Sequence, residues 1–107
     1  MALVRDAKDR DLEYINEILR INGQINDVNK EDRKDFMVVE EDGRVAGCGM
    51  LKEYEEGFEI RKVSVLPECQ GKGIGKEITL TLLERTKGKK CWLLSVDMHT
   101  FWEQFGF

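Results

Sequence analysis

A glycine-rich stretch in the second half of the chain has the composition of a phosphate-binding site. Residues 63–75 read VSVLPECQGKGIG, in which an apolar segment ends at Pro67 and glycines then occupy alternate positions. The glycines are Gly71, Gly73 and Gly75. Such spacing lets the backbone turn several N–H groups toward one concave side. A helix beginning there adds unpaired N–H donors and the positive end of its dipole, so the stretch predicts binding of phosphate oxygens.

The spacing of the glycines argues against two common nucleotide-binding loops. A nucleoside triphosphate loop needs Ser or Thr directly after Gly-Lys, but Glu77 follows Lys76. A dinucleotide fold needs GxGxxG between parallel strands, whereas this chain has GxGxG after segments that read as antiparallel hairpins. A purely structural glycine-rich turn stays open at this point.

The distribution of charge favours a local anion site. The whole chain has 17 basic and 21 acidic residues and a net charge of −4, which argues against a general nucleic-acid binder. Residues 61–90 contain eight basic and three acidic side chains, a net charge of +5, and the remainder is at −9. A basic segment in an acidic protein suggests an anionic ligand, although lysines scattered over a solvated helix would give the same count.

The elements that must position this loop follow from the pattern of apolar residues. We expect strands over 2–5, 36–40, 44–54, 58–66 and 90–96, the last of them central in the sheet. We expect Asp9 or Asp11 to cap a helix that stops at Gly23, and we expect further helices over 74–86 and 98–105. Asp42-Gly43 favours a tight hairpin turn. Hairpins followed by a strand–helix–strand unit predict an α/β (α+β) fold, with a mixed, mostly antiparallel central sheet flanked by helices.

Two local irregularities are expected within the strands. The apolar spacing slips from even to odd between Ile60 and Val63, which predicts a β-bulge because alternation is otherwise strict. Gly47 and Gly49 are unusual inside a strand and indicate a bulge or the close approach of another backbone.

Length and composition restrict the class of protein. With 107 residues, 41% hydrophobic and 36% charged, the chain predicts a single globular domain over 1–107. No apolar run approaches the roughly 18 residues of a membrane span, and the start MALVRDAKDRD does not resemble a signal peptide, so we expect no membrane association and a cytoplasmic location. Three widely spaced cysteines without a CxxC pair predict neither a disulfide framework nor a metal site.

The stretch Gln70-Gly-Lys-Gly-Ile-Gly75, preceded by Val-Ser-Val-Leu-Pro, resembles the pyrophosphate-binding motif of the GNAT acetyltransferase superfamily. The resemblance extends to the order of elements, to the FMVVEEDGRVAGCGML hairpin and to the ending FWEQFGF. It implies a GNAT-like fold over nearly the whole chain. It also implies an enzyme, an N-acetyltransferase that moves an acetyl group from acetyl-CoA to a primary amine of a small molecule or amino acid.

The resemblance also assigns cofactor contacts. Backbone N–H groups of the glycine-rich loop would hold the CoA pyrophosphate, and the end of the preceding strand would pair with the pantetheine arm. The bulge near Lys62–Ser64 would aim a backbone N–H at the thioester carbonyl, where a fixed donor stabilises an oxyanion. The expected acetyl-CoA contacts are Val63, Ser64, Val65, Gln70, Gly71, Lys72, Gly73, Ile74, Gly75 and Lys76.

A base must take a proton from the acceptor amine. In many relatives a Glu on the motif strand does so through water, and Glu59, eleven residues before Gln70, is at the matching place. Glu59 could equally be a surface strand residue. The runner-up carboxylates are Glu53, Glu55 and Glu56, which could also form an acidic patch or a solvated loop.

Two departures from the family pattern leave an alternative open. Trp102 stands where many relatives have a proton-donating Tyr, and with Phe101 it is similar to the N-acetylglutamate-synthase-like branch. The chain also stops at Phe107, before the usual final pair of strands, which predicts an open sheet edge and a homodimer. The alternative is a catalytically weak CoA-binding regulatory or sensor protein of the same fold.

Overall fold

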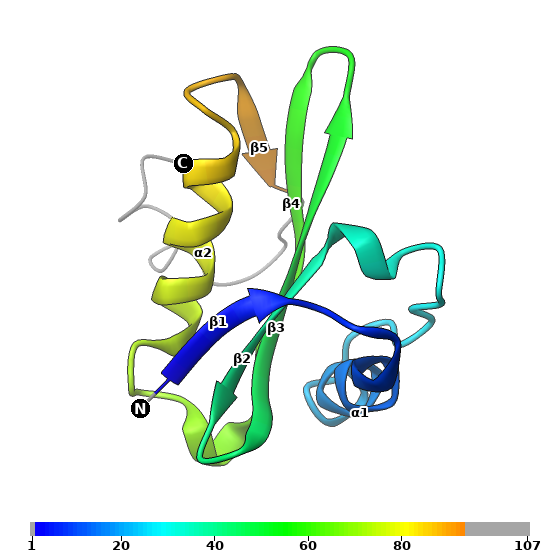
Figure 1. Cartoon of the computed structure of the whole chain (residues 1–107), viewed down its shortest axis with the longest axis vertical. Helices are drawn as coiled ribbons and strands as arrows, with labels where there is room; N and C mark the ends of the chain where they lie inside the picture. The colour runs from blue at the N-terminus through cyan, green and yellow to red at the C-terminus, as the bar shows by residue number, and fades with distance from the viewer. Residues whose placement is uncertain (1, 94–107) are drawn as a thin grey trace.

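A five-stranded sheet forms the centre of the part of the chain, residues 2–93, that this computed structural model describes. Figure 1 shows its arrangement. The strands are β1 (Ala2–Asp6), β2 (Phe36–Glu41), β3 (Arg44–Tyr54), β4 (Gly57–Val65) and β5 (Cys91–Leu93). They lie in sequence order across the sheet; the first four are antiparallel and β5 is parallel to β4. The predicted mixed, mostly antiparallel sheet is therefore confirmed.

Two helices cover opposite faces of this sheet (Figure 1). They are α1 (Leu12–Ile21) and α2 (Ile74–Arg85), and three short 3-10 turns lie at Asp9–Asp11, Arg33–Asp35 and Pro67–Cys69. The apolar residues of β2 alternate between the two faces, so this strand is buried on both sides. Phe36 and Val38 pack toward α1, and Met37 and Val39 pack toward α2.

Helix α2 lies unusually close to β3 because that strand carries two glycines. A Cβ built on Gly49 would be 2.6 Å from Ile78 Cγ2, and one on Gly47 would be 3.1 Å from Ile74 Cγ2. The predicted close approach is thus confirmed, and the approaching element is a helix. It fixes α2 against the middle of the sheet, so the start of α2 lies beside the end of β4.

The predicted bulge is present where β3 pairs with β4. Ser64 is opposite Cys48 but Arg61 is opposite Met50, so Lys62 and Val63 share the single partner Gly49. Lys62 has a φ of 53°, in the left-handed region that side-chain-bearing residues seldom adopt.

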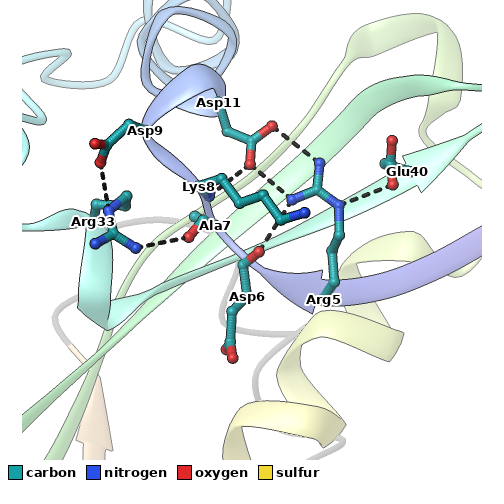
Figure 2. Close-up of polar contacts among 8 residues, drawn as sticks. All are labelled: Arg5, Asp6, Ala7, Lys8, Asp9, Asp11, Arg33 and Glu40. Carbon is teal, nitrogen blue, oxygen red and sulfur yellow. Dashed lines mark hydrogen bonds and ion pairs between the residues drawn. The ribbon is translucent and has the colours of Figure 1, made fainter.

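A partly buried ion-pair network holds β1 and β2 to the start of α1 (Figure 2). The Arg5 guanidinium donates to both oxygens of Asp11, at 2.7 and 3.0 Å, and to Glu40 Oε2 at 2.8 Å. Asp11 stands at the N-cap of α1, as expected, but makes no side-chain cap hydrogen bond to that helix. Its carboxylate accepts the Lys8 N–H (2.7 Å), which caps the 3-10 turn before α1, and the Arg5 donors, and Asp9 pairs with Arg33.

The end of the described chain departs from expectation in one respect. Strand β5 pairs with β4 alone among residues 2–93, so within this part it lies at the edge of the sheet and not at its centre. The rest of the strand predicted over 90–96 and the helix predicted over 98–105 lie outside the described residues. No helix in the described part is both long and apolar enough to cross a membrane.

Candidate functional site

The glycine-rich loop folds as an exposed cradle at the start of α2. Gly71 and Gly73 have φ of 83° and 82°, and a Cβ on either would meet nothing within 4 Å. Glycine is needed there for its backbone conformation, and the space above the loop is open. The Glu77 N–H donates to Gly73 C=O at 3.0 Å as the first bond of the helix. The N–H groups of residues 74–76 precede it and lack helical acceptors, so they can hold an anion.

The side chains of the loop contact their own protein rather than the open space. Gln70 Nε2 donates to Val65 C=O at 3.1 Å, which holds the loop against the end of β4. Lys72 Nζ lies 3.0 Å from Glu41 Oε1 at the end of β2, and this hydrogen bond raises the pKa of Lys72. Ile74 is buried in the core, and Lys76 is exposed. A phosphate at this loop would therefore be held mainly by backbone N–H groups.

Strand β4 has an open edge between the loop and Glu59. Its residues 58–60 pair with β5, but residues 61–65 pair with β3 alone in the described part of the chain. The Leu66 N–H donates to Ala46 C=O in the direction of β3. Because successive residues alternate, the peptide groups of Val65 and Val63 point to the other edge. An extended chain could pair with that edge as an added strand.

Part of this edge is already occupied by side-chain amides. Asn22, at the end of α1, donates from Nδ2 to Ser64 Oγ at 2.6 Å and to Val65 C=O at 2.8 Å. Val65 C=O thus accepts from both Asn22 and Gln70. Ser64 is itself buried and hydrogen-bonded, so the structure assigns its side chain to the fold and leaves its backbone beside the bulge.

Glu59 is buried on the face of the sheet that α1 covers. Its exposed fraction is only 7%, which is low for a carboxylate on a strand next to the sheet edge. Tyr54 Oη donates to Glu59 Oε1 at 3.0 Å, and Arg61 Nε lies 3.9 Å from the same oxygen. The interpretation of Glu59 as a simple surface residue is therefore wrong.

The other candidate carboxylates are differently placed. Glu53, Glu55 and Glu56 are exposed near the turn between β3 and β4. Glu53 lines a hollow of about 330 Å³ on the opposite face, beside the end of α2. A second hollow, of about 430 Å³, lies between the start of α1 and the β2–β3 turn. Neither hollow is lined by Glu59 or by the glycine-rich loop. The candidate site is therefore the open edge of β4 together with the exposed loop, and neither hollow is part of it.

The three predicted parts of the site lie along one strand. Glu59, the bulge at Lys62–Val63 and the glycine-rich loop follow one another along β4 and its end. At 3.3 Å per residue, Glu59 and Val65 are about 20 Å apart. Sequence reasoning missed Asn22, Tyr54 and Arg61. The tight turn after β3 was the one local signal: it places Tyr54 opposite Gly57 and so near Glu59 in the hairpin, but it does not show that the Tyr54 hydroxyl meets the carboxylate.

Comparison with known proteins identifies the family of this chain. The domain family described as "Acetyltransferase (GNAT) domain" matches residues 32–107, and the chain therefore belongs to the GNAT acetyltransferase family. No curated protein sequence matches the chain significantly.

Solved structures share the fold over nearly the whole chain. Rv2747 from Mycobacterium tuberculosis, in complex with CoA and NLQ, is 27% identical with a TM-score of 0.87, over 97% of this chain and 70% of that one. N-acetylglutamate synthase from Neisseria gonorrhoeae, complexed with coenzyme A and L-arginine, is 21% identical with a TM-score of 0.85, over 97% of this chain. The match spans only 26% of that synthase. A Brucella melitensis GNAT acetyltransferase in complex with acetyl-CoA is 23% identical with a TM-score of 0.74, over 100% of this chain and 82% of that one.

Proposed function

We propose that this protein is an N-acetyltransferase that moves an acetyl group from acetyl-CoA to the primary amine of a small molecule or amino acid. The observation that carries the proposal is the arrangement along β4, where an N–H-rich loop, an open strand edge and a buried carboxylate follow in order. Acetyl-CoA, an extended molecule with a diphosphate at one end and a thioester at the other, suits this order. Membership of the GNAT family supports the same assignment.

Each part of the site has one task in this reaction. The backbone N–H groups of residues 71–76 bind the pyrophosphate, and the edge at Val63 and Val65 pairs with the pantetheine arm. Glu59 takes the proton of the acceptor amine through water, and the neutral nitrogen then attacks the thioester carbon. A backbone N–H at the bulge stabilises the oxyanion. The C–S bond breaks, the acetyl group stays on nitrogen, and the second proton that this nitrogen loses passes through water to the leaving thiolate, while Glu59 returns the first proton to solvent.

The charges around Glu59 favour an acceptor that carries a carboxylate. Lys52 is opposite Glu59 in the register, and Arg61 follows two residues later on the same face. A carboxylate beside the reacting amine would find these cations next to the base. The homodimer and the cytoplasmic location stay predictions; a mass of 12.4 kDa by light scattering at high micromolar concentration would exclude the dimer.

One assay with two readouts tests the proposal. Calorimetric titration measures acetyl-CoA binding, and DTNB detects free CoA released with and without a panel of amino acids, polyamines and peptide N-termini. We expect binding together with CoA release that depends on one class of amine. Binding without any amine-dependent release would favour the CoA-binding regulatory protein.

A further inference from the structure

We propose that Tyr54 is a positioning residue, whose hydroxyl fixes one oxygen of Glu59 and turns the other toward the acceptor. This inference rests on the proposed function of Glu59 as the base. It adds to the candidate site a residue on β3 that no loop or strand pattern in the sequence singles out.

The geometry places Tyr54 over Glu59. Tyr54 is on β3 and Trp92 is on β5, the two strands that flank β4, and Trp92 is directly opposite Glu59 in the register. Strands two apart in a sheet are about 10 Å apart. The two rings nevertheless stack, with centroids 5.7 Å apart and planes inclined by 26°. They must therefore meet above β4, and this pair explains why Glu59 is nearly inaccessible.

The contacts distinguish the two oxygens of the carboxylate. The Tyr54 hydroxyl, at 3.0 Å, and Arg61 Nε, at 3.9 Å, both approach Oε1, and Oε2 takes neither contact. Two further charged groups face Tyr54 and Glu59. Lys52 is opposite Glu59 in the register, and Glu56 lies near the Tyr54 hydroxyl. A carboxylate held at one oxygen by a donor and a cation presents the second oxygen in a fixed direction, which is what proton transfer from a bound amine or water requires.

The hydroxyl acts as a donor and not as an acid in this arrangement. Its hydrogen bond to Glu59 raises the pKa of Tyr54, because losing the proton would place two negative charges side by side. The raised pKa keeps the phenol protonated at neutral pH and somewhat above. The hydrogen bond to Glu59 thus persists over the pH range in which an acetyltransferase would work.

Tyr54→Phe is the direct test, because it removes the hydroxyl and keeps the ring that stacks on Trp92. Tyr14→Phe, at another partly exposed tyrosine on α1, is the matched control. The first readout is the ¹³C resonance of the Glu59 side-chain carboxyl, assigned by Glu59→Gln and recorded at neutral pH. Loss of the Tyr54 donor should change the chemical shift of this resonance in Tyr54→Phe, and the shift should stay unchanged in Tyr14→Phe.

The second readout is steady-state kinetics with acetyl-CoA and the best amine found in the panel. Tyr54→Phe should lower kcat about tenfold, the value of one hydrogen bond, with a nearly constant KM for acetyl-CoA. In the Glu59→Gln background the same substitution should have no further effect. An unchanged carboxyl resonance, or a changed resonance with unchanged kcat, would overturn the role of Tyr54. Full turnover by Glu59→Gln would instead overturn the proposed base, so the two failures are distinguishable.

Discussion

The two ends of the candidate site are built in opposite ways. The glycine-rich loop is exposed and depends on backbone conformation, with side chains turned back onto the protein. The Glu59 end is buried and depends on side chains that three neighbouring strands bring together. A backbone site tolerates changes of side chain but not of conformation, whereas a side-chain site is sensitive to the loss of a single functional group. Substitutions at the two ends should therefore have different effects.

The largest effect is expected at the buried end. Glu59→Gln keeps the shape of the side chain and removes its basicity, so kcat/KM should fall about 100- to 10,000-fold at neutral pH. Acetyl-CoA affinity, measured by calorimetry, should stay nearly constant because the loop is far from residue 59. The loss in kcat/KM should shrink as pH rises, since more of the acceptor amine is then neutral. An equal loss at every pH, accompanied by weaker CoA binding, would indicate a folding defect instead.

A substitution outside both ends should affect stability alone. Burial raises the pKa of Asp11, but hydrogen bonds from Arg5 and the Lys8 N–H outweigh it and hold that pKa below its ordinary value of 3.8. Asp11→Asn should lower the free energy of unfolding by about 2 kcal/mol at pH 7, roughly a 30-fold change in the folding equilibrium. The difference should narrow as pH falls below about 4, because stability from a lowered carboxyl pKa is present above the unfolded value and lost on acidification. Urea titrations at several pH values measure this loss of stability. A changed acetyl-CoA affinity in the folded variant would contradict the expectation that Asp11 acts on stability alone.

The loop should respond to a change of backbone conformation and charge. Gly73→Asp places a side chain at a φ of 82° and a carboxylate where phosphate oxygens are expected, so acetyl-CoA affinity should fall more than tenfold. Gly88→Asp is the matched control, because Gly88 also has a positive φ (78°) and open space around it but lies beyond α2. Equal acetyl-CoA affinities in the two folded variants would show that the loop is not part of the binding site.

The smallest effect is expected from a side chain of the loop. Lys72→Gln removes one exposed charge that already pairs with Glu41, so acetyl-CoA affinity should fall only about twofold to fivefold. This difference should decrease as salt rises, because exposed charges are screened. Calorimetry at low and high ionic strength measures both trends. A loss as large as that of Gly73→Asp would show that side chains, and not the backbone, dominate binding at the loop.

The same contrast explains what the sequence could predict. The loop, the hairpin turn and the bulge were predictable because each follows from local signals, such as the alternate glycines, Asp42-Gly43 and the slip between Ile60 and Val63. Glu59 was found only by its distance from a family motif. Its partners were missed because Tyr54 and Trp92 meet across an intervening strand, and strand register is a property of the assembled sheet. Asp11 stands at the expected N-cap of α1 but makes no side-chain hydrogen bond to that helix for a similar reason, since Arg5 on β1 engages the carboxylate.

The bulge residue Lys62 also constrains a loop that is far away in the sequence. Lys62 holds a left-handed conformation that costs about 1–2 kcal/mol for a residue with a side chain. Its ammonium group reaches Ile25 C=O at 3.1 Å and Asp27 Oδ1 at 3.3 Å, in the connection between α1 and β2. In polymer terms, the contact divides that connection into two shorter spans and lowers the chain entropy that the folded loop retains. A single backbone irregularity in β4 thereby helps to order the segment that leaves α1 just after Asn22.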